Sequence, residues 1–123
     1  IANLNTASVA TLSDMFKDLY NLNTLNISSL STSSATATKN MFKNLSAISG
    51  ASIAIDLSGQ DTSNITDMED MFSAAQTVSI DATGWDVSSV SNNTGFRTSS
   101  SGTLFCDQGG SPGTGSLHGE ACN

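Results

Sequence analysis

The chain has 123 residues, enough for one domain, and Ser, Thr, Asn and Gly supply 57 of them. Charged residues make up only 12% of the chain, about half of the usual share. The net charge of −7 excludes a typical nucleic-acid-binding protein, and no apolar run approaches the roughly 18 residues of a membrane span. The composition is typical of an extracellular surface protein and unlike that of a common metabolic enzyme.

The first five residues offer no cap for the rest of the chain. The chain begins at Ile1 without the basic and hydrophobic regions of a signal peptide, so we expect a processed mature chain or an excised fragment. Ile1 and Leu4 are the apolar residues of this segment, and an uncovered end of a repeat stack is a template for another chain. Ile1 and Leu4 therefore mark the expected assembly end. The alternative, that preceding repeats or a domain were removed, is equally open.

An internal repeat dominates the sequence. Met-Phe pairs recur at residues 15–16, 41–42 and 71–72, and a degenerate copy ends at Arg97. Units of this length cannot bury an apolar face alone, so we expect them to stack around a continuous core of Met and Phe side chains. The chain is then one domain, residues 1–123. Its expected repeats cover residues 5–31, 32–61, 62–86 and 87–106, and a C-terminal cap or tail covers residues 107–123.

Each repeat is predicted to contain a short helix. The spacing of apolar residues in the first repeat matches one stripe of a helix, and Ile65 to Ala75 repeat this spacing. A short polar residue precedes each stripe and suits the N-cap position. The stripe of the first repeat is Val9, Leu12, Met15, Phe16 and Leu19, and the expected caps are Ser8, Ser34, Asn64 and Ser89.

A short strand is predicted after each helix, because apolar and polar residues alternate there. The alternating segments are Leu25–Ile27, Ile55–Leu57, Val78–Ile80 and the residues around Leu104. Strands of stacked units would lie side by side as a narrow parallel sheet. The expected fold class is therefore α/β: a short right-handed solenoid, leucine-rich-repeat-like, of about four helix-strand units.

The third repeat carries a resemblance to a known family. Residues 62–72, Thr-Ser-Asn-Ile-Thr-Asp-Met-Glu-Asp-Met-Phe, resemble the repeats of BspA-like leucine-rich repeat surface proteins, and Gly84–Val90 is similar to the join between such repeats. The resemblance extends from Asn5 to Arg97 and is strongest in this repeat. It implies an exported, non-catalytic protein that acts in cell-surface adhesion or in matrix or host contact.

The last repeat and the tail form the expected C-terminal cap. Asn93 and Arg97 stand where core residues stand in the third repeat, as a terminal repeat that faces water requires. Cys106 and Cys122 are 16 residues apart around a Gly-rich stretch. A disulfide between them would lower the entropy of the unfolded chain by an amount worth about 3 kcal/mol and so hold the tail in place. Such a bond indicates an oxidising compartment. Metal binding is disfavoured, because neither cysteine has a CxxC partner.

Catalytic chemistry finds little support in the sequence. A Ser-His-Asp site needs a histidine, and His118 lies alone in the Gly-rich tail. The aspartates and glutamate that could form the carboxylate pair of a glycosidase are already accounted for by helix capping and by contact with solvent. No calcium-binding loop or nucleotide-binding motif occurs. We expect no enzyme, no cofactor and no metal. The carboxylates considered for catalysis or for calcium are Asp56, Asp61, Asp67, Glu69, Asp70, Asp81 and Asp86.

Four N-glycosylation sequons begin at Asn26, Asn44, Asn64 and Asn92. Asn26 falls on the outward face of a predicted strand and Asn44 follows a predicted helix, so both should be exposed. Asn64 is a predicted helix cap and therefore a poorer site.

The sequence thus predicts a non-catalytic, secreted cell-surface protein with a structural or adhesive role that assembles end to end into a filament or longer array. Its expected partners are further copies or other surface proteins, and glycans are a further candidate. The alternatives are a monomeric adhesin or ligand-binding fragment of a larger surface protein and, less favoured, an ice-binding protein. Ice binding would need outward threonines in register, which the predicted strands lack.

Overall fold

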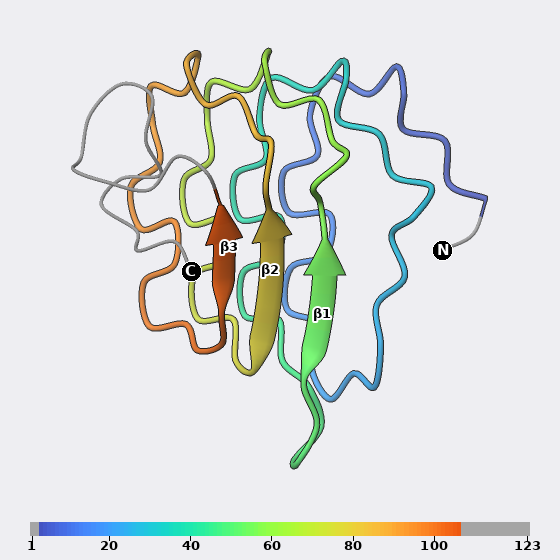
Figure 1. The fold of residues 1–123 in the computed structure, drawn as a ribbon, viewed down its shortest axis with the longest axis vertical. Helices are drawn as coiled ribbons and strands as arrows, with labels where there is room; N and C mark the ends of the chain where they lie inside the picture. Colours follow the sequence, from blue (N-terminus) through green and yellow to red (C-terminus); the bar gives the residue numbers. More distant parts are fainter. Residues whose placement is uncertain (1–2, 107–123) are drawn as a thin grey trace.

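The computed structural model describes residues 3–106, which form three short parallel strands and a series of turns. The strands are β1 (Ile53–Asp56), β2 (Val78–Ala82) and β3 (Leu104–Cys106), and they make one sheet in the order β1-β2-β3 (Figure 1). The register places Ile80 between Ile55 and Leu104. Each strand comes from a different repeat, so the predicted narrow parallel sheet is confirmed.

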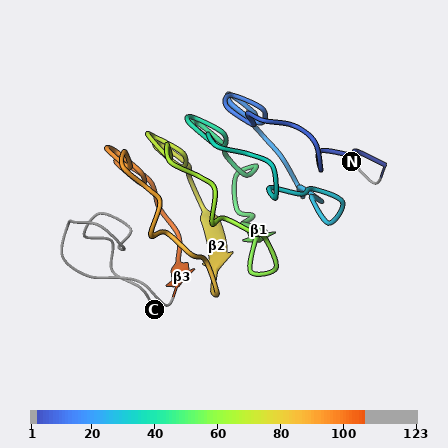
Figure 2. The same cartoon turned by 90° about the horizontal axis from the view of Figure 1, so that it is seen from above.

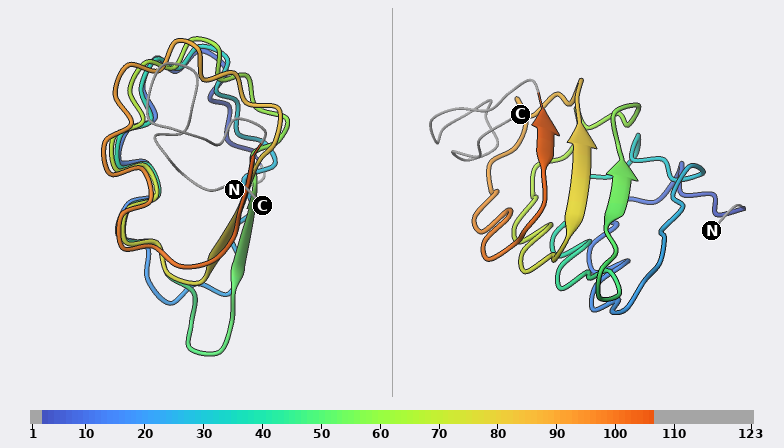
Figure 3. Two further views of the ribbon diagram at one scale, coloured as in Figure 1. Left: turned by 60° about the vertical axis from the view of Figure 1, so that its left-hand side comes forward. Right: turned by 60° about the horizontal axis from the view of Figure 1, so that its bottom comes forward.

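Each repeat forms one coil of the chain, and the coils stack in layers. We call them coil 1 (residues 5–31), coil 2 (32–61), coil 3 (62–86) and coil 4 (87–106). Away from the sheet, parallel bridges join Ala37 to Thr11 on one side and to Asp67 on the other, and Asp67 to Asn92. The layers are separate in Figure 2, and in the left panel of Figure 3 the coils nearly superpose.

The predicted helices are wrong, because the Met-Phe segments form tight turns and no helix occurs within residues 3–106. Successive N–H groups bond in different directions: that of Met41 donates to Thr38 within the turn, at 3.1 Å, whereas that of Phe42 donates to Met71 of the next coil, at 2.8 Å. In a helix both would donate four residues back along the chain. The expected fold class, an α/β leucine-rich-repeat-like solenoid of helix-strand units, is therefore incorrect.

Residues in the left-handed region explain why these segments turn. Asp14, Asn40 and Asp70 directly precede the Met-Phe pairs and have φ values of 60°, 55° and 53°. Aspartate and asparagine tolerate this region better than other non-glycine residues do, and Gly95 takes the same place in coil 4. Four residues further on, φ is positive again, at Asp18, Asn44, Ala74 and Ser99. A helix cannot continue through residues of opposite handedness.

The predicted N-caps are wrong together with the helices. Ser8, Ser34, Asn64 and Ser89 each lie inside a turn such as that closed by the Ile65 N–H, which donates to the Thr62 carbonyl at 3.0 Å. Two of these side chains instead reach the preceding coil. The Ser34 Oγ donates to the Ala7 carbonyl at 2.6 Å, and the Asn64 Nδ2 donates to the Ser33 carbonyl at 3.2 Å.

The strand predictions are confirmed in three of the four coils. β2 and β3 lie where alternation places them, and β1 begins two residues before the predicted segment. In coil 1, Leu25–Ile27 is not a strand. This segment runs beside β1 in Figure 1 without pairing with it, so the sheet stops at β1.

The predicted core of Met and Phe side chains is confirmed. Phe16, Phe42 and Phe72 are buried and stack face to face, with ring centroids 5.3 Å and 5.0 Å apart. Phe96 meets Phe72 edge-on at 5.5 Å and so extends this column into coil 4.

Buried threonines tie the beginning of each of the first three coils to its end. Thr6, Thr32 and Thr62 occupy equivalent places, and each is at most 4% exposed. Their hydroxyl groups donate to the carbonyls of Ser31, Asp61 and Asp86 at the end of the same coil, at 2.8, 2.6 and 2.9 Å. Val87 takes this place in coil 4 and is fully buried. The polar column therefore runs through the first three coils.

Candidate functional site

Coil 1 presents an uncovered row of backbone acceptors. Four carbonyls of coil 2 accept N–H groups from coil 1 at 2.9 Å each: those of Ala37, Lys39, Met41 and Lys43, from Leu12, Asp14, Phe16 and Asp18. The equivalent carbonyls of coil 1 face the outer side of the stack and accept no hydrogen bond from the described residues. We call these four carbonyl groups the coil 1 edge: Thr11, Ser13, Met15 and Lys17.

Apolar side chains beside the coil 1 edge are only partly covered. Met15 and Leu19 are half-buried, whereas Met41 and Leu45, their equivalents in coil 2, are fully buried. The difference arises because coil 2 has a neighbour on both sides. Backbone acceptors and apolar side chains thus coincide at this end of the stack, which is the combination that another coil would cover.

Leu4, one of the two residues predicted at the assembly end, is half-buried, and Ile1, the other, lies outside the described residues.

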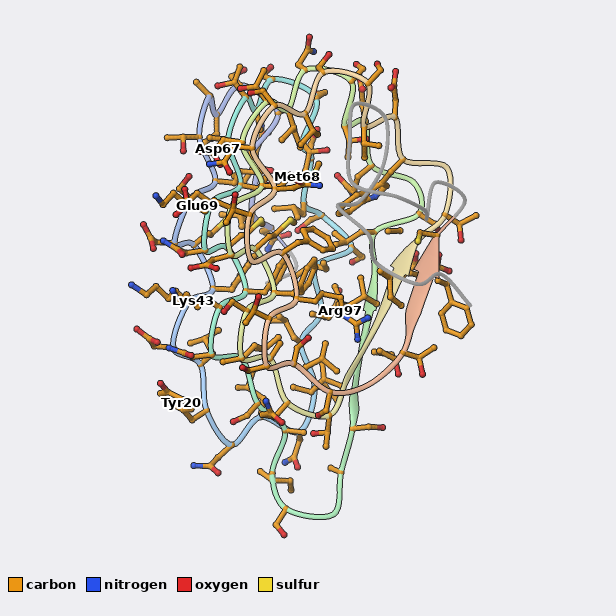
Figure 4. All side chains as sticks on the ribbon, turned by 90° about the vertical axis from the view of Figure 1, so that its left-hand side faces the viewer. Tyr20, Lys43, Asp67, Met68, Glu69 and Arg97 are labelled. Carbon is orange, nitrogen blue, oxygen red and sulfur yellow. The ribbon has the colours of Figure 1, made fainter. Side chains whose placement is uncertain are left out.

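The outer surface of the Met-Phe turns carries charged side chains that bridge successive coils. Lys43 pairs with Asp70 at 2.7 Å, and Lys39 pairs with Glu69 at 3.1 Å. The pKa of Glu69 is lowered most by a hydrogen bond from the Asn92 Nδ2, at 2.9 Å, and next by the hydrogen bond from Lys39. The bond between Lys39 and Glu69 also raises the pKa of Lys39. In Figure 4 the side chains of Glu69 and Lys43 lie on the outer side of the turns, whereas Met68 and Arg97 lie inside.

A groove separates β1 from coil 1. Its volume is about 490 Å³, and its walls are residues 23–28 of coil 1 and Ser52, Ile53, Ala54 and Asp56 at β1. The Ile53 N–H donates to Thr77, so in this parallel register Ile53 and Ile55 direct their backbone groups toward β2. The N–H and C=O groups of Ala54 and Asp56 therefore point to the other edge, which no described strand pairs with.

The groove was not predicted, because alternation placed a strand at Leu25–Ile27 that would have extended the sheet. The available signal was the spacing of the Met-Phe pairs. Coil 2 spans 30 residues between its Met-Phe pair and the next, against 26 for coil 1. The chain around the turn Ile48–Ala51 leads into β1 and extends beyond the other coils in the left panel of Figure 3.

The carboxylates considered for catalysis or calcium binding have structural partners or lie apart. The Asp67 Oδ1 accepts the Glu69 N–H at 2.9 Å, and Asp70 pairs with Lys43. Asp56 and Asp81 are neighbours in the register of β1 and β2, whereas Asp61 and Asp86 begin separate turns. Within residues 3–106, no three His, Cys, Asp or Glu side chains are grouped closely enough to hold a metal ion.

The four sequon asparagines differ in their surroundings. Asn26 and Asn64 are exposed, whereas Asn44 and Asn92 are half-buried. The Asn44 Nδ2 donates to Asp18 at 2.6 Å, and the Asn92 Nδ2 is held by Glu69. Asn26 is thus exposed as expected and Asn44 is not. Glycan attachment itself stays a prediction.

Cys106, one of the two cysteines of the predicted disulfide, is disulfide-bonded, and no described cysteine is a free thiol. Cys106 ends β3 and is half-buried, whereas Cys122 lies outside the part of the chain that the structure describes. His118 lies outside it as well. Between residues 3 and 106 there is no helix that is long and apolar enough to cross a membrane.

Comparison with known proteins gives one partial match. The model of a family described as "Mycoplasma protein of unknown function, DUF285" matches residues 1–55, which cover coil 1 and most of coil 2. No curated protein and no solved structure matches the chain. The N-terminal part of the chain is therefore similar to this family.

Proposed function

We propose that this chain is a non-catalytic structural or adhesive protein of the cell surface that assembles end to end. The observation that carries the proposal is the coil 1 edge, where carbonyls that accept no hydrogen bond from residues 3–106 lie beside the half-buried Met15 and Leu19. A second copy that docks head to tail would supply N–H donors and cover the apolar side chains. Such a contact does not close on itself, and so it builds filaments.

The surface location is supported by the sequence. Residues 62–72 resemble the repeats of BspA-like surface proteins. A surface rich in hydroxyl and amide side chains suits an exported protein. Ice binding is not proposed, because the outward side chains of Asp56, Asp81 and Phe105 form no row of threonines.

Sedimentation velocity of the complete 123-residue chain tests the assembly, together with electron microscopy of the same samples. We expect the mean particle mass to rise with protein concentration and short rods to form. Leu19→Lys places a charge beside the coil 1 edge and should keep the chain monomeric. Thr83→Lys is the matched control, because Thr83 is exposed in coil 3, which has a neighbouring coil on both sides.

A wild-type chain that stays monomeric at every concentration contradicts end-to-end assembly and leaves the monomeric adhesin. Binding of that monomer to extracellular matrix or to a glycan array would then support the adhesive role directly. Equal assembly by the Leu19→Lys and Thr83→Lys variants would place the contact elsewhere on the molecule.

A further inference from the structure

We propose that the groove between β1 and coil 1 binds an extended peptide segment of another protein, which adds to the sheet as a strand beside β1. The segment is apolar at alternate positions and carries a basic residue. This inference uses a different surface from the coil 1 edge and does not depend on end-to-end assembly.

The backbone of β1 provides the hydrogen-bonding groups for such a strand. Ala54 and Asp56 each direct an N–H and a C=O away from β2, toward the groove. Unpaired groups of this kind at a sheet edge are the docking site in strand addition, where main-chain hydrogen bonds supply affinity. β1 has four residues and spans about 13 Å, so the site fits a segment of about four residues.

The walls of the groove offer apolar contact at one residue on each side. Ala54 is exposed on the β1 side and Leu25 is half-buried on the coil 1 side, whereas Ile53 and Ile27 also line the groove but are buried. Residues 25–27 belong to no strand and take part in none of the β-bridges between described residues. A peptide in the groove therefore meets a strand edge on one side and the side chain of Leu25 on the other.

Charge selects the occupant. Asp56 is the one charged residue of the groove wall, and its bonds from the Ser58 hydroxyl and N–H lower its pKa, so it is ionised at neutral pH. The whole chain carries a net charge of −7. An acidic peptide, or the acidic surface of a second copy, is disfavoured here, and a lysine or arginine opposite Asp56 is favoured.

The probe is a capped, fluorescently labelled heptapeptide in which valine alternates with lysine and threonine, and binding to the complete chain is followed by fluorescence anisotropy. We expect saturable binding that is lost when every second peptide amide is N-methylated. Ala54→Pro removes a groove-facing N–H without removing a bond to β2, and it should weaken binding about fivefold. The N-methylated peptide leaves the protein intact, so it tests the contact even where this variant folds poorly.

Asp56→Asn tests the charge, with Asp61→Asn as the matched control. Both aspartates accept bonds from a serine two residues later, but Asp61 does not line the groove. We expect weaker binding for Asp56→Asn and unchanged binding for Asp61→Asn. Replacing the lysines of the peptide by glutamate should abolish binding.

Hydrogen exchange locates the contact. The Ala54 and Asp56 amides should gain protection when the peptide binds, whereas the amides of the residues at the coil 1 edge (Thr11, Ser13, Met15 and Lys17) should not change. No binding by the peptide, or binding that N-methylation leaves intact, would overturn the inference. Protection of Ala54 and Asp56 that rises with protein concentration in the absence of peptide would overturn it too, because it would assign the groove to a second copy of this chain.

Discussion

The ring of Phe42 lies face to face with the ring of Phe72, with centroids 5.0 Å apart and planes 5° from parallel. Phe16 continues this stack on the other side of Phe42. Because the side chains come from successive coils, the stack defines the spacing of the layers at the centre of the core. Each inner ring is enclosed by rings from both neighbours.

Phe42→Ala should lower the free energy of unfolding by about 3–5 kcal/mol, because it opens a cavity between two layers that cannot collapse onto each other. Urea unfolding followed by circular dichroism measures this loss. Phe105→Ala removes the same side chain from an exposed position and should change stability by less than about 0.5 kcal/mol. Equal losses for the two variants would contradict the layered core.

Ala74→Gly should stabilise the chain, although glycine usually destabilises. Ala74 has φ = 55°, in the left-handed region that costs a residue with a Cβ about 1–2 kcal/mol and glycine almost nothing. The greater freedom of glycine in the unfolded chain offsets about 0.4–1 kcal/mol of this gain. Ala37→Gly is the control, because Ala37 lies in a parallel bridge and has no positive φ. A lower urea midpoint for Ala74→Gly than for Ala37→Gly would contradict this explanation.

These left-handed residues also explain why the sequence predicts the core but not the helices. The turns repeat every four residues, which is close to the 3.6-residue period of a helix, so Leu12, Phe16 and Leu19 show the same apolar stripe in either conformation. The distinguishing signal was the residue before each Met-Phe pair. Asp14, Asn40 and Asp70 are suited to positive φ. A helix would not require an aspartate or asparagine at this position in every repeat.

Of the two candidate sites, the sequence predicted the coil 1 edge but not the groove. Stacking predicted an uncovered side at coil 1, and no described coil pairs with that side. Alternation at Leu25–Ile27 predicted the buried Ile27 but could not show whether the segment pairs with β1. That pairing depends on how coil 2 approaches coil 1 in space, and hydrophobic alternation carries no information about this distance.

Thr62→Val should lower the free energy of unfolding by about 1–3 kcal/mol, because the Asp86 N–H and C=O both lose the buried Thr62 hydroxyl, at 2.9 Å each. The measurement is the urea midpoint. Thr62→Ser keeps the hydroxyl and should retain most of the stability. If the serine variant lost as much stability as the valine variant, packing of the threonine methyl group and not the hydrogen bonds would hold the two ends of coil 3 together.

Asn26 should carry more glycan than Asn44 when the chain is secreted from a eukaryotic host. The Asn44 amide nitrogen is held by Asp18 at 2.6 Å and its side chain is half-buried, whereas Asn26 is exposed. Mass spectrometry of tryptic peptides after glycosidase treatment measures the occupancy of each site. Asp18→Ala releases the Asn44 amide and should raise occupancy there, and a higher occupancy at Asn44 than at Asn26 in the wild type would contradict the ranking.

Stability should fall in acid below about pH 5. Hydrogen bonds from Asn92 and, to a smaller extent, from Lys39 lower the pKa of Glu69 from its ordinary value of 4.5. Hydrogen bonds from serine hydroxyls lower the pKa values of Asp56, Asp61 and Asp86 from 3.8. A carboxylate with a lower pKa in the folded chain stabilises it fully above the unfolded pKa. This contribution is lost as the pH falls through the folded pKa, because the unfolded chain then binds more protons.

Glu69→Gln separates the coil-bridging carboxylate from the three aspartates. Glutamine cannot ionise, so this variant should be less stable than the wild type at pH 7 and should lose less of its stability between about pH 5 and pH 3. The urea midpoint at each pH measures both effects, and added salt should reduce the difference at pH 7, because Glu69 and Lys39 are partly exposed. If the two proteins lost stability in parallel over this interval, the acid sensitivity would arise from the aspartates in the turns. The bonds from Asn92 and Lys39 to Glu69 would then contribute nothing to the cohesion of coils 2, 3 and 4.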